Sequence, residues 1–154
     1  MTKRDNINTS MNIKFKNHIV ITGLLFVLSG EFLYAAEVPP RNSDPVVYSK
    51  GARLYQLNCS QCHGVNAEGG KNWRRQVDGI FPPPPLNGTG HAWHHSTDVL
   101  VRTIKQGTIK LGGRMPAWKD KLNDQEIGAI LVWIQAQWPD EIYNAWYNNF
   151  YQDK

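Results

Sequence analysis

The sequence predicts an all-α domain, and three observations support this prediction. Apolar residues recur at three- and four-residue steps in several segments between residues 46 and 151. Residues that suit helix N-termini stand directly before these segments. No segment alternates apolar and polar residues as a half-buried strand does, and no internal repeat is present. The 154 residues are enough for one domain with its own core and too few for two.

The first predicted helix covers residues 46–58. Asp44 and Pro45 stand at its start, because Asp is a good N-cap and Pro fits the first helical position. The next stretch, residues 64–90, is rich in Gly and contains consecutive prolines at 82–85. Since prolines favour extended backbone and lack an N–H donor, we expect a long loop here.

Further helices are predicted over residues 96–107, 123–138 and 140–151. Residues 108–122 are expected to form a loop. Asn123 with Glu126 three residues later is a capping-box pattern, and Pro139 then ends the helix that this pattern opens. Each of these three helices has one apolar face. The faces are, in chain order, Val99, Leu100 and Ile104 in the first; Ile127, Ile130, Leu131 and Ile134 in the second; and Ile142, Trp146 and Phe150 in the third.

Residues 1–36 have the pattern of a secretory signal peptide. A positive segment with Lys14 and Lys16 precedes an apolar run over residues 19–28, and small residues follow at positions 35–36. The apolar run is shorter than the about 20 residues that a spanning helix needs. We therefore expect export out of the cytoplasm, which in a double-membraned bacterium means the periplasm.

An uncleaved membrane anchor is the alternative for this segment. Cleavage after Ala35 or Ala36 would place Leu33 or Tyr34 where signal peptidases usually meet a small residue. Contact with a membrane is expected only in this case. The interpretation leaves a linker over residues 37–45 and a domain over residues 46–154.

The charge of the chain excludes one class of partner. The formal net charge is +4, and part of it lies in the predicted signal. Because no run of Lys and Arg is present after residue 36, we expect no nucleic acid partner.

Cys59-Ser60-Gln61-Cys62-His63 is the motif that carries the chemistry. Two thiols three residues apart lie on the same face of one helical turn, where each can add to a vinyl group of one haem. The imidazole of the next residue can then ligate the iron. Cys-x-x-Cys-His is the attachment signature of haem c, so Cys59 and Cys62 are predicted to hold one haem covalently and His63 to be an axial ligand.

Three other readings of the two cysteines are weaker. A redox-active dithiol belongs to a βαβ fold, and the sequence predicts no strand. A structural zinc site needs four ligands, but the chain has only two cysteines. A disulfide between residues three apart would close a very small loop and add little stability.

Met115 is the candidate for the second axial position. It is the only Met after residue 36, and it stands in the segment Gly112-Gly113-Arg114-Met115-Pro116. Glycines allow the backbone to approach a flat ligand, and the proline stiffens the turn. Most Met residues fill cores, but a sole Met in such a loop after a haem motif favours ligation. Ligation by His and Met suits electron transfer, because it occupies both axial sites.

With these residues in hand, the chain resembles the bacterial class I, single-haem c-type cytochromes over residues 47–138. The resemblance rests on the haem motif, Gly51 and Tyr55, Pro84-Pro85-Leu86-Asn87-Gly88, Met115-Pro116-Ala117-Trp118, and Leu122 to Ile127 with Trp133. It implies three to five helices around one haem, with the first and last helices crossing near Gly51 and Trp133. It also implies that the carbonyl of Pro84 or Pro85 accepts a hydrogen bond from the His63 imidazole. Trp118, where Phe is more usual, and the aromatic tail after Pro139 depart from the simplest members.

The histidines His91, His94 and His95 form an unusual cluster. A similar segment occurs in the cytochromes that the chain resembles, and the resemblance implies a structural role for it. Imidazoles are good ligands for copper and zinc, so a second metal site is one hypothesis, and replacement of Met115 on the iron is another. No carboxylate or thiol stands beside them to complete a metal site. We therefore expect a polar loop that leads into the helix at Ser96, with Trp93 packed on the domain.

These observations predict a periplasmic electron carrier rather than an enzyme, with no catalytic residue. It would exchange one electron at a time with periplasmic or membrane redox proteins through transient docking. One alternative is a cytochrome subunit of a periplasmic oxidoreductase. A haem enzyme or gas sensor with a displaceable distal ligand is a further alternative, which Met115 disfavours.

Overall fold

The computed structural model of the protein describes residue 41 and residues 44–152. The chain divides into two units, residues 1–34 and 35–154, and every described residue belongs to the second. The predicted signal peptide or anchor over residues 1–36 lies outside the described residues.

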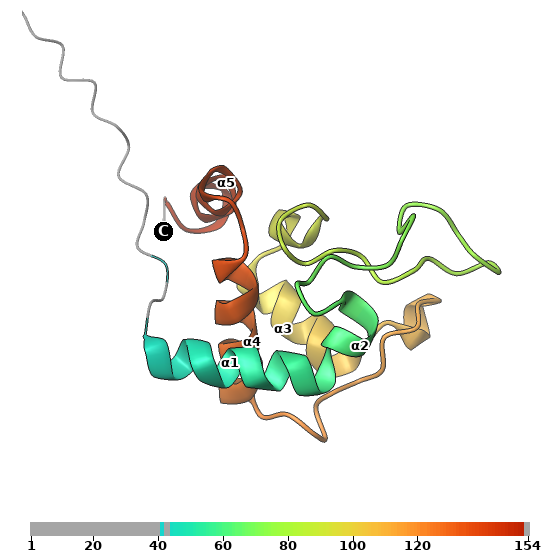
Figure 1. The fold of residues 1–154 in the computed structure, drawn as a ribbon, viewed down its shortest axis with the longest axis horizontal. Helices are drawn as coiled ribbons and strands as arrows, with labels where there is room; N and C mark the ends of the chain where they lie inside the picture. Colours follow the sequence, from blue (N-terminus) through green and yellow to red (C-terminus); the bar gives the residue numbers. More distant parts are fainter. Residues whose placement is uncertain (1–40, 42–43, 153–154) are drawn as a thin grey trace, which may run out of the picture. The chain divides into compact units, whose positions relative to one another are not determined.

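The described part of the chain is helical, which confirms the all-α prediction. Its only β pairing is an isolated bridge between Val77 and Ile80. The helices are α1 (Pro45–Asn58), α2 (Ser60–His63), α3 (Thr97–Gln106), α4 (Asp124–Ala136) and α5 (Asp140–Tyr151), with short 3₁₀ turns at Ala92–His94 and Ile109–Leu111. Figure 1 shows long connections on either side of α3, as the Gly- and Pro-rich stretches predict.

Helices α1 and α4 cross and pack against each other (Figure 1). Gly51 on α1 lies directly against the backbone carbonyl group of Ala129 and near the Cβ atom of Trp133 on α4. One turn further along α1, the ring of Tyr55 packs on the ring of Trp133 with their centroids 4.2 Å apart. The crossing near Gly51 and Trp133 that the resemblance implies is thereby confirmed.

The predicted helix caps are present. The Asp44 carboxylate accepts a hydrogen bond of 2.8 Å from the backbone N–H of Val46, and Pro45 occupies the first turn of α1. Asn123 and Glu126 form the reciprocal capping box at the start of α4. One detail differs, since α4 ends at Ala136, before Pro139, and Pro139 instead stands at the start of α5.

Helix α5 covers the residues predicted for it but buries a different face. Tyr143 and Trp146 are its buried residues, whereas Ile142 and Phe150 are only half-buried. Trp146 meets Trp138 edge-on at 5.6 Å, and its indole N–H donates a hydrogen bond of 2.9 Å to the carbonyl oxygen of His95. An aromatic edge contact and a satisfied indole N–H stabilise α5 on the segment that precedes α3.

Arg41 ties the predicted linker to the domain. Its guanidinium group donates to the carbonyl oxygen of Gln135, in the last turn of α4, at 2.9 Å and to that of Trp138, just beyond the helix, at 2.6 Å. It also pairs with the Asp140 carboxylate at 2.7 Å and lies over the ring of Tyr143 at 4.5 Å. Carbonyl groups at a helix C-terminus have no partner within the helix, and Arg41 supplies one.

Candidate haem-binding site

The Cys-x-x-Cys-His motif lies on α2, directly after α1. Cys59 is the N-cap of α2, and the backbone N–H of His63 donates to the Cys59 carbonyl at 2.9 Å, which closes one helical turn. Both cysteines are free thiols, with Cys59 half-buried and Cys62 exposed. Burial, together with the neighbouring Cys62, raises the pKa of the Cys59 thiol to about 11.

The His63 imidazole is held by the proline-rich loop. Its Nδ1 atom lies 2.9 Å from the carbonyl oxygen of Pro84. Because a carbonyl oxygen only accepts hydrogen bonds, Nδ1 carries the proton and Nε2 keeps a free lone pair. Burial lowers the pKa of His63, although the hydrogen bond to Pro84 acts in the opposite direction. A neutral imidazole with a free Nε2 is the form that ligates a metal. Of the two carbonyl groups predicted to accept this hydrogen bond, those of Pro84 and Pro85, the structure shows that of Pro84.

Short backbone hydrogen bonds fix the loop that carries Pro84. The N–H of Gly70 donates to the Pro83 carbonyl at 2.8 Å, and the N–H of Leu86 donates to the Ala67 carbonyl at 2.8 Å. Ala67 is fully buried at the centre of this turn. The Pro84 carbonyl therefore belongs to a segment anchored on both sides, which orients the imidazole below it.

Met115 lies in a tight loop closed by Thr108. The Thr108 N–H donates to the Met115 carbonyl at 2.8 Å, and the Thr108 hydroxyl oxygen accepts from the Met115 N–H at 3.2 Å. Gly107, at φ +66°, ends α3 with its Cα against the backbone of Met115 and Pro116. Only glycine adopts this conformation without strain, and a Cβ atom would collide with that backbone. The loop holds Met115 half-buried.

Two adjoining cavities bring the four predicted site residues together. The larger, of about 420 Å³, is lined by Cys59, Cys62, His63 and Met115. The smaller, of about 200 Å³, shares His63 and Met115 with it. The remaining apolar lining of the smaller cavity comprises Leu86, Ala92, Leu100, Ile104, Leu131 and Ile134.

The residues present fit a haem c. Apolar walls on both sides of a shared space suit a flat, greasy macrocycle. Two free thiols on one turn stand at one end of that space, and an oriented imidazole and a thioether stand in its walls. These are the donors that haem c attachment and His/Met ligation need.

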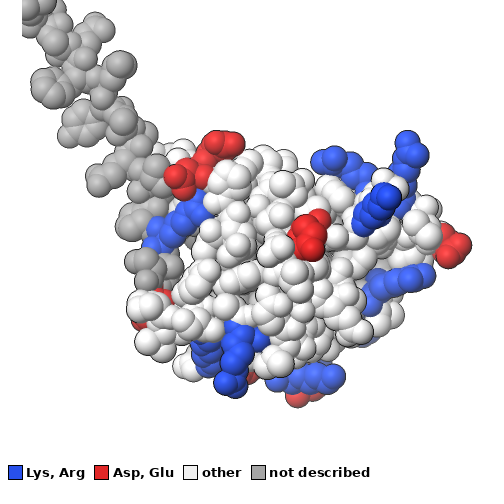
Figure 2. Space-filling view, in the orientation of Figure 1, with Lys and Arg blue, Asp and Glu red and all other residues white. Residues whose placement is uncertain are grey.

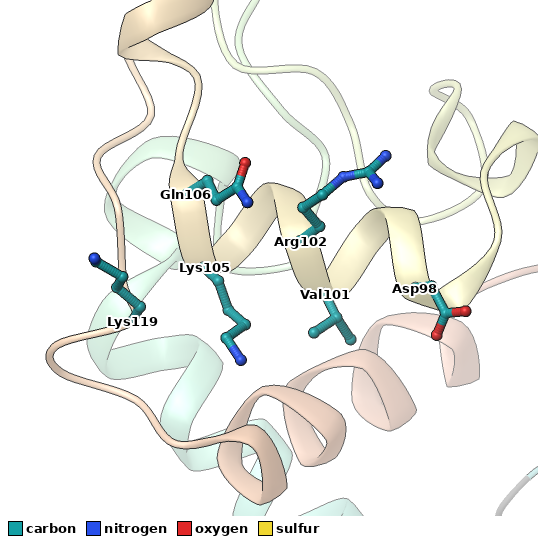
Figure 3. A pocket seen from close by; sticks show the side chains of 6 residues that line it. All are labelled: Asp98, Val101, Arg102, Lys105, Gln106 and Lys119. Atoms are coloured by element: carbon teal, nitrogen blue, oxygen red, sulfur yellow. The ribbon is translucent and has the colours of Figure 1, made fainter.

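A further pocket, of about 360 Å³ and separate in its lining from these two cavities, lies along α3 (Figure 3). Asp98, Val101, Arg102, Lys105 and Gln106 project from α3, and Lys119 comes from the segment before α4. The Lys105 ammonium pairs with the Asp124 carboxylate at 2.7 Å. The lining of this pocket is mostly charged and contains neither a cysteine nor an axial ligand candidate, so the pocket does not fit a haem.

The sequence predicted a polar loop for His91 and His95 and no role for Thr108. All three line the smaller cavity, and His91 and Thr108 line the larger one as well. His91 is exposed in part, and burial and the neighbouring histidines lower its pKa. Among the described residues, no group of three His, Cys, Asp or Glu side chains is arranged to hold a metal ion. The segment also contains a 3₁₀ turn where a plain loop was expected.

The chain matches the family described as "Cytochrome C oxidase, cbb3-type, subunit III" over residues 47–134. It belongs to this family. The matched residues include the haem motif, the Pro84 loop, the Met115 loop and most of α4. The family consists of c-type cytochromes, so the chain has a c-type cytochrome domain that transfers electrons, and haem c is the cofactor that the family implies.

Similar proteins with curated names are subunits of cbb3-type oxidases. The CcoP subunit of Azospirillum brasilense is 33% identical over 103 residues, which is 66% of this chain and 32% of the relative. The FixP subunit of Azorhizobium caulinodans is 33% identical over 95 residues, or 60% of this chain and 28% of the relative. The chain thus spans about a third of the length of the curated relatives it matches. No solved structure matches the chain.

These similarities favour a cytochrome subunit of an oxidoreductase over a free electron carrier, which was the main expectation from the sequence. Helices long and apolar enough to cross a bilayer are absent from residue 41 and residues 44–152.

Proposed function

We propose that this protein is the electron-transferring cytochrome subunit of a membrane-associated oxidoreductase, exported to the periplasmic side and carrying one haem c. The observation that carries the proposal is the single space lined by Cys59, Cys62, His63 and Met115. The protein passes electrons and turns over no substrate itself.

Each residue of the site has one role. A bound haem c supplies one-electron redox chemistry at its iron. Cys59 and Cys62 would hold the haem covalently through two thioethers. His63 would offer Nε2 to the iron, because the Pro84 carbonyl engages its Nδ1 proton. Met115 would offer its thioether, and the Thr108 contacts fix the backbone that carries it.

The mouth of the larger cavity suits contact with a redox partner. Phe81 and Leu111 line it, and their side chains are 55% and 85% exposed. Large apolar side chains with this exposure next to a cofactor site favour a protein contact. On the face shown in Figure 2, several Lys and Arg side chains gather at the right-hand end, and uncharged surface separates them from the other charged groups. We expect docking to use apolar contact by Phe81 and Leu111 at the cavity.

Fractionation of cells that produce the protein tests the subunit assignment. Membranes are solubilised in mild detergent, and native gels are stained for haem and probed for this chain. Co-migration of the chain with a larger membrane redox complex supports the proposal. Recovery of all the protein as a monomer in the soluble periplasmic fraction would overturn it in favour of a free carrier.

The spectrum of the purified holoprotein tests the ligand assignment separately. A six-coordinate, low-spin haem with a weak near-infrared sulfur–iron band is expected for His63 and Met115. A five-coordinate, high-spin haem in the unmodified protein would contradict the role of Met115.

A further inference from the structure

The three histidines of the cluster differ in which of the two cavities they line. His91 lines both cavities, and His95 lines the smaller one. His94 lines neither, and its ring lies on that of Trp93, at 3.8 Å between centroids. Two of the three histidines therefore face the space that also contains His63 and Met115.

Ring contacts position the His91 and His95 side chains, and two further contacts hold the backbone that carries them. The His91 ring stacks on Trp73 at 5.6 Å and meets the His95 ring edge-on at 5.8 Å. Gly90 precedes them and lies against the carbonyl group of Pro85, so a side chain at this position would collide with that group. Trp146 on α5 donates to the His95 carbonyl oxygen. The segment is fixed against the loop that orients His63.

The two cavities differ in a way that matches the two edges of a haem. A haem carries its vinyl groups toward one edge and its two propionates toward the opposite edge. Both cysteines line the larger cavity and neither lines the smaller one. Attachment at Cys59 and Cys62 would therefore direct the propionate edge toward the smaller cavity.

The smaller cavity offers few partners for a carboxylate. None of the described residues that line it is a Lys or an Arg. Apart from the axial candidate His63, its polar side chains are His91, His95, Thr103 and Thr108. Thr103 already donates its hydroxyl to the Val99 carbonyl at 2.8 Å. A buried carboxylate is costly unless it is hydrogen-bonded. The groups able to donate to it are the two imidazoles and the Thr108 hydroxyl, which accepts from the Met115 N–H but donates to no partner among the described residues.

We propose that His91 and His95 are the hydrogen-bonding partners of the haem propionates. This inference rests on the haem site of the proposed function. The two histidines are positioning residues for the cofactor, since they hold its inner edge while the thioethers hold its outer edge. By donating to the propionates, they also offset negative charge near the iron.

Five variants of the holoprotein, two pairs and one control, test the inference. His91→Leu and His95→Leu remove the donors, His91→Gln and His95→Gln keep an amide N–H, and His94→Leu is the matched control. Reduction potential is measured by spectroelectrochemistry, and propionate carboxylate bands by redox-difference infrared spectroscopy. The Leu variants at 91 and 95 are expected to lower the potential and shift these bands, because uncompensated carboxylates stabilise Fe(III). The Gln variants are expected to restore part of both changes.

Potentials and carboxylate bands that match the His94→Leu control in all four variants would overturn the inference. If the Leu variants do not fold, the ferrous wild-type protein still gives an answer by NMR. Contacts between the imidazole protons of His91 and His95 and the propionate methylene protons are expected, and their absence for both residues would overturn the inference. Absence of covalent haem in the wild-type protein would instead overturn the proposed function, so the two failures are distinguishable.

Discussion

The hydroxyl group of Tyr55 donates a hydrogen bond of 2.8 Å to the carbonyl oxygen of Gly64, the residue that follows His63. Tyr55 is fully buried, and its ring packs on Trp133. One side chain of α1 thus connects the helix crossing to the end of the haem motif. The stability of the fold and the position of His63 are coupled through this residue.

Replacing Tyr55 by Phe tests this coupling. Loss of the hydrogen bond is expected to lower the free energy of unfolding by about 1 kcal/mol. Burial, with smaller contributions from Cys59 and Glu68, raises the pKa of Tyr55 well above its ordinary value. The folded state therefore keeps the proton while the unfolded state loses it, and this stability is lost as pH rises above about 10. Denaturant unfolding at a series of alkaline pH values should show a smaller decline for Tyr55→Phe, and an equal decline would contradict the prediction.

Two glycine-to-alanine variants should have opposite effects. In Gly51→Ala, the added Cβ collides with the Ala129 carbonyl and forces α1 away from α4, which should cost about 1–3 kcal/mol. In Gly128→Ala, nothing lies within 4 Å of the added Cβ. The free energy of unfolding should rise by about 0.5–1 kcal/mol, because Ala has a better helix propensity than Gly. Thermal unfolding of both holoproteins measures the difference, and a stable Gly51→Ala protein would contradict the crossing.

Removal of the thiols should abolish covalent haem. Cys59→Ala and Cys62→Ala each lose one thioether, and most mature holoprotein is expected to be lost with it, because the haem fills so much of a small core. Denaturing gels stained for haem measure the covalent product. Undiminished staining in the double variant would refute the attachment.

Met115→Ala should open the sixth coordination position. Loss of a thioether that favours Fe(II) is expected to lower the reduction potential, and the ferrous haem should then bind carbon monoxide. Leu111→Ala is the control, because Leu111 lines the same cavity with 85% of its surface exposed and is no ligand candidate. Carbon monoxide that binds the unmodified protein equally fast would exclude Met115 as the ligand.

The contacts of Arg41 should contribute unequally to the free energy of unfolding. Arg41→Ala removes the partner of the Gln135 and Trp138 carbonyls, and a loss of about 1–2 kcal/mol is expected. Asp140→Ala removes only an ion pair whose carboxylate is 81% exposed, which should cost less than about 0.5 kcal/mol. Chemical denaturation of the two variants measures both values. Equal losses would show that the ion pair, and not the carbonyl contacts, is what matters.

Local signals in the sequence predicted most of the helices. The Asn123 capping box, the Pro45 start and the Gly107 stop depend on neighbouring residues, and each was found where expected. The haem motif and the Met115 loop also have local signatures. Family resemblance supplied the Pro84 contact, which no local pattern indicates.

Features that depend on distant residues were not predictable in this way. The role of Arg41 arises from carbonyl groups almost a hundred positions away in the chain. Helix α5 buries Tyr143 rather than Ile142, because aromatic rings from Trp138 and Trp146 select the face. His91 and His95 reach the cavity because Gly90 packs on Pro85, and helical periodicity carries no information on such a contact.

The folded domain extends beyond the residues that match the family model, because it includes α5 and the segment before it. The family match ends at residue 134, but the Trp138 indole N–H donates to the Leu86 carbonyl at 2.7 Å, and the Tyr151 hydroxyl donates to the Thr97 hydroxyl at 2.8 Å. These bonds secure segments that belong to the matched region. A fragment cut back to residues 47–134 would keep every predicted haem ligand but would lose both hydrogen bonds. Residues after position 134 therefore help to hold Leu86, in the wall of the predicted haem cavity, in place.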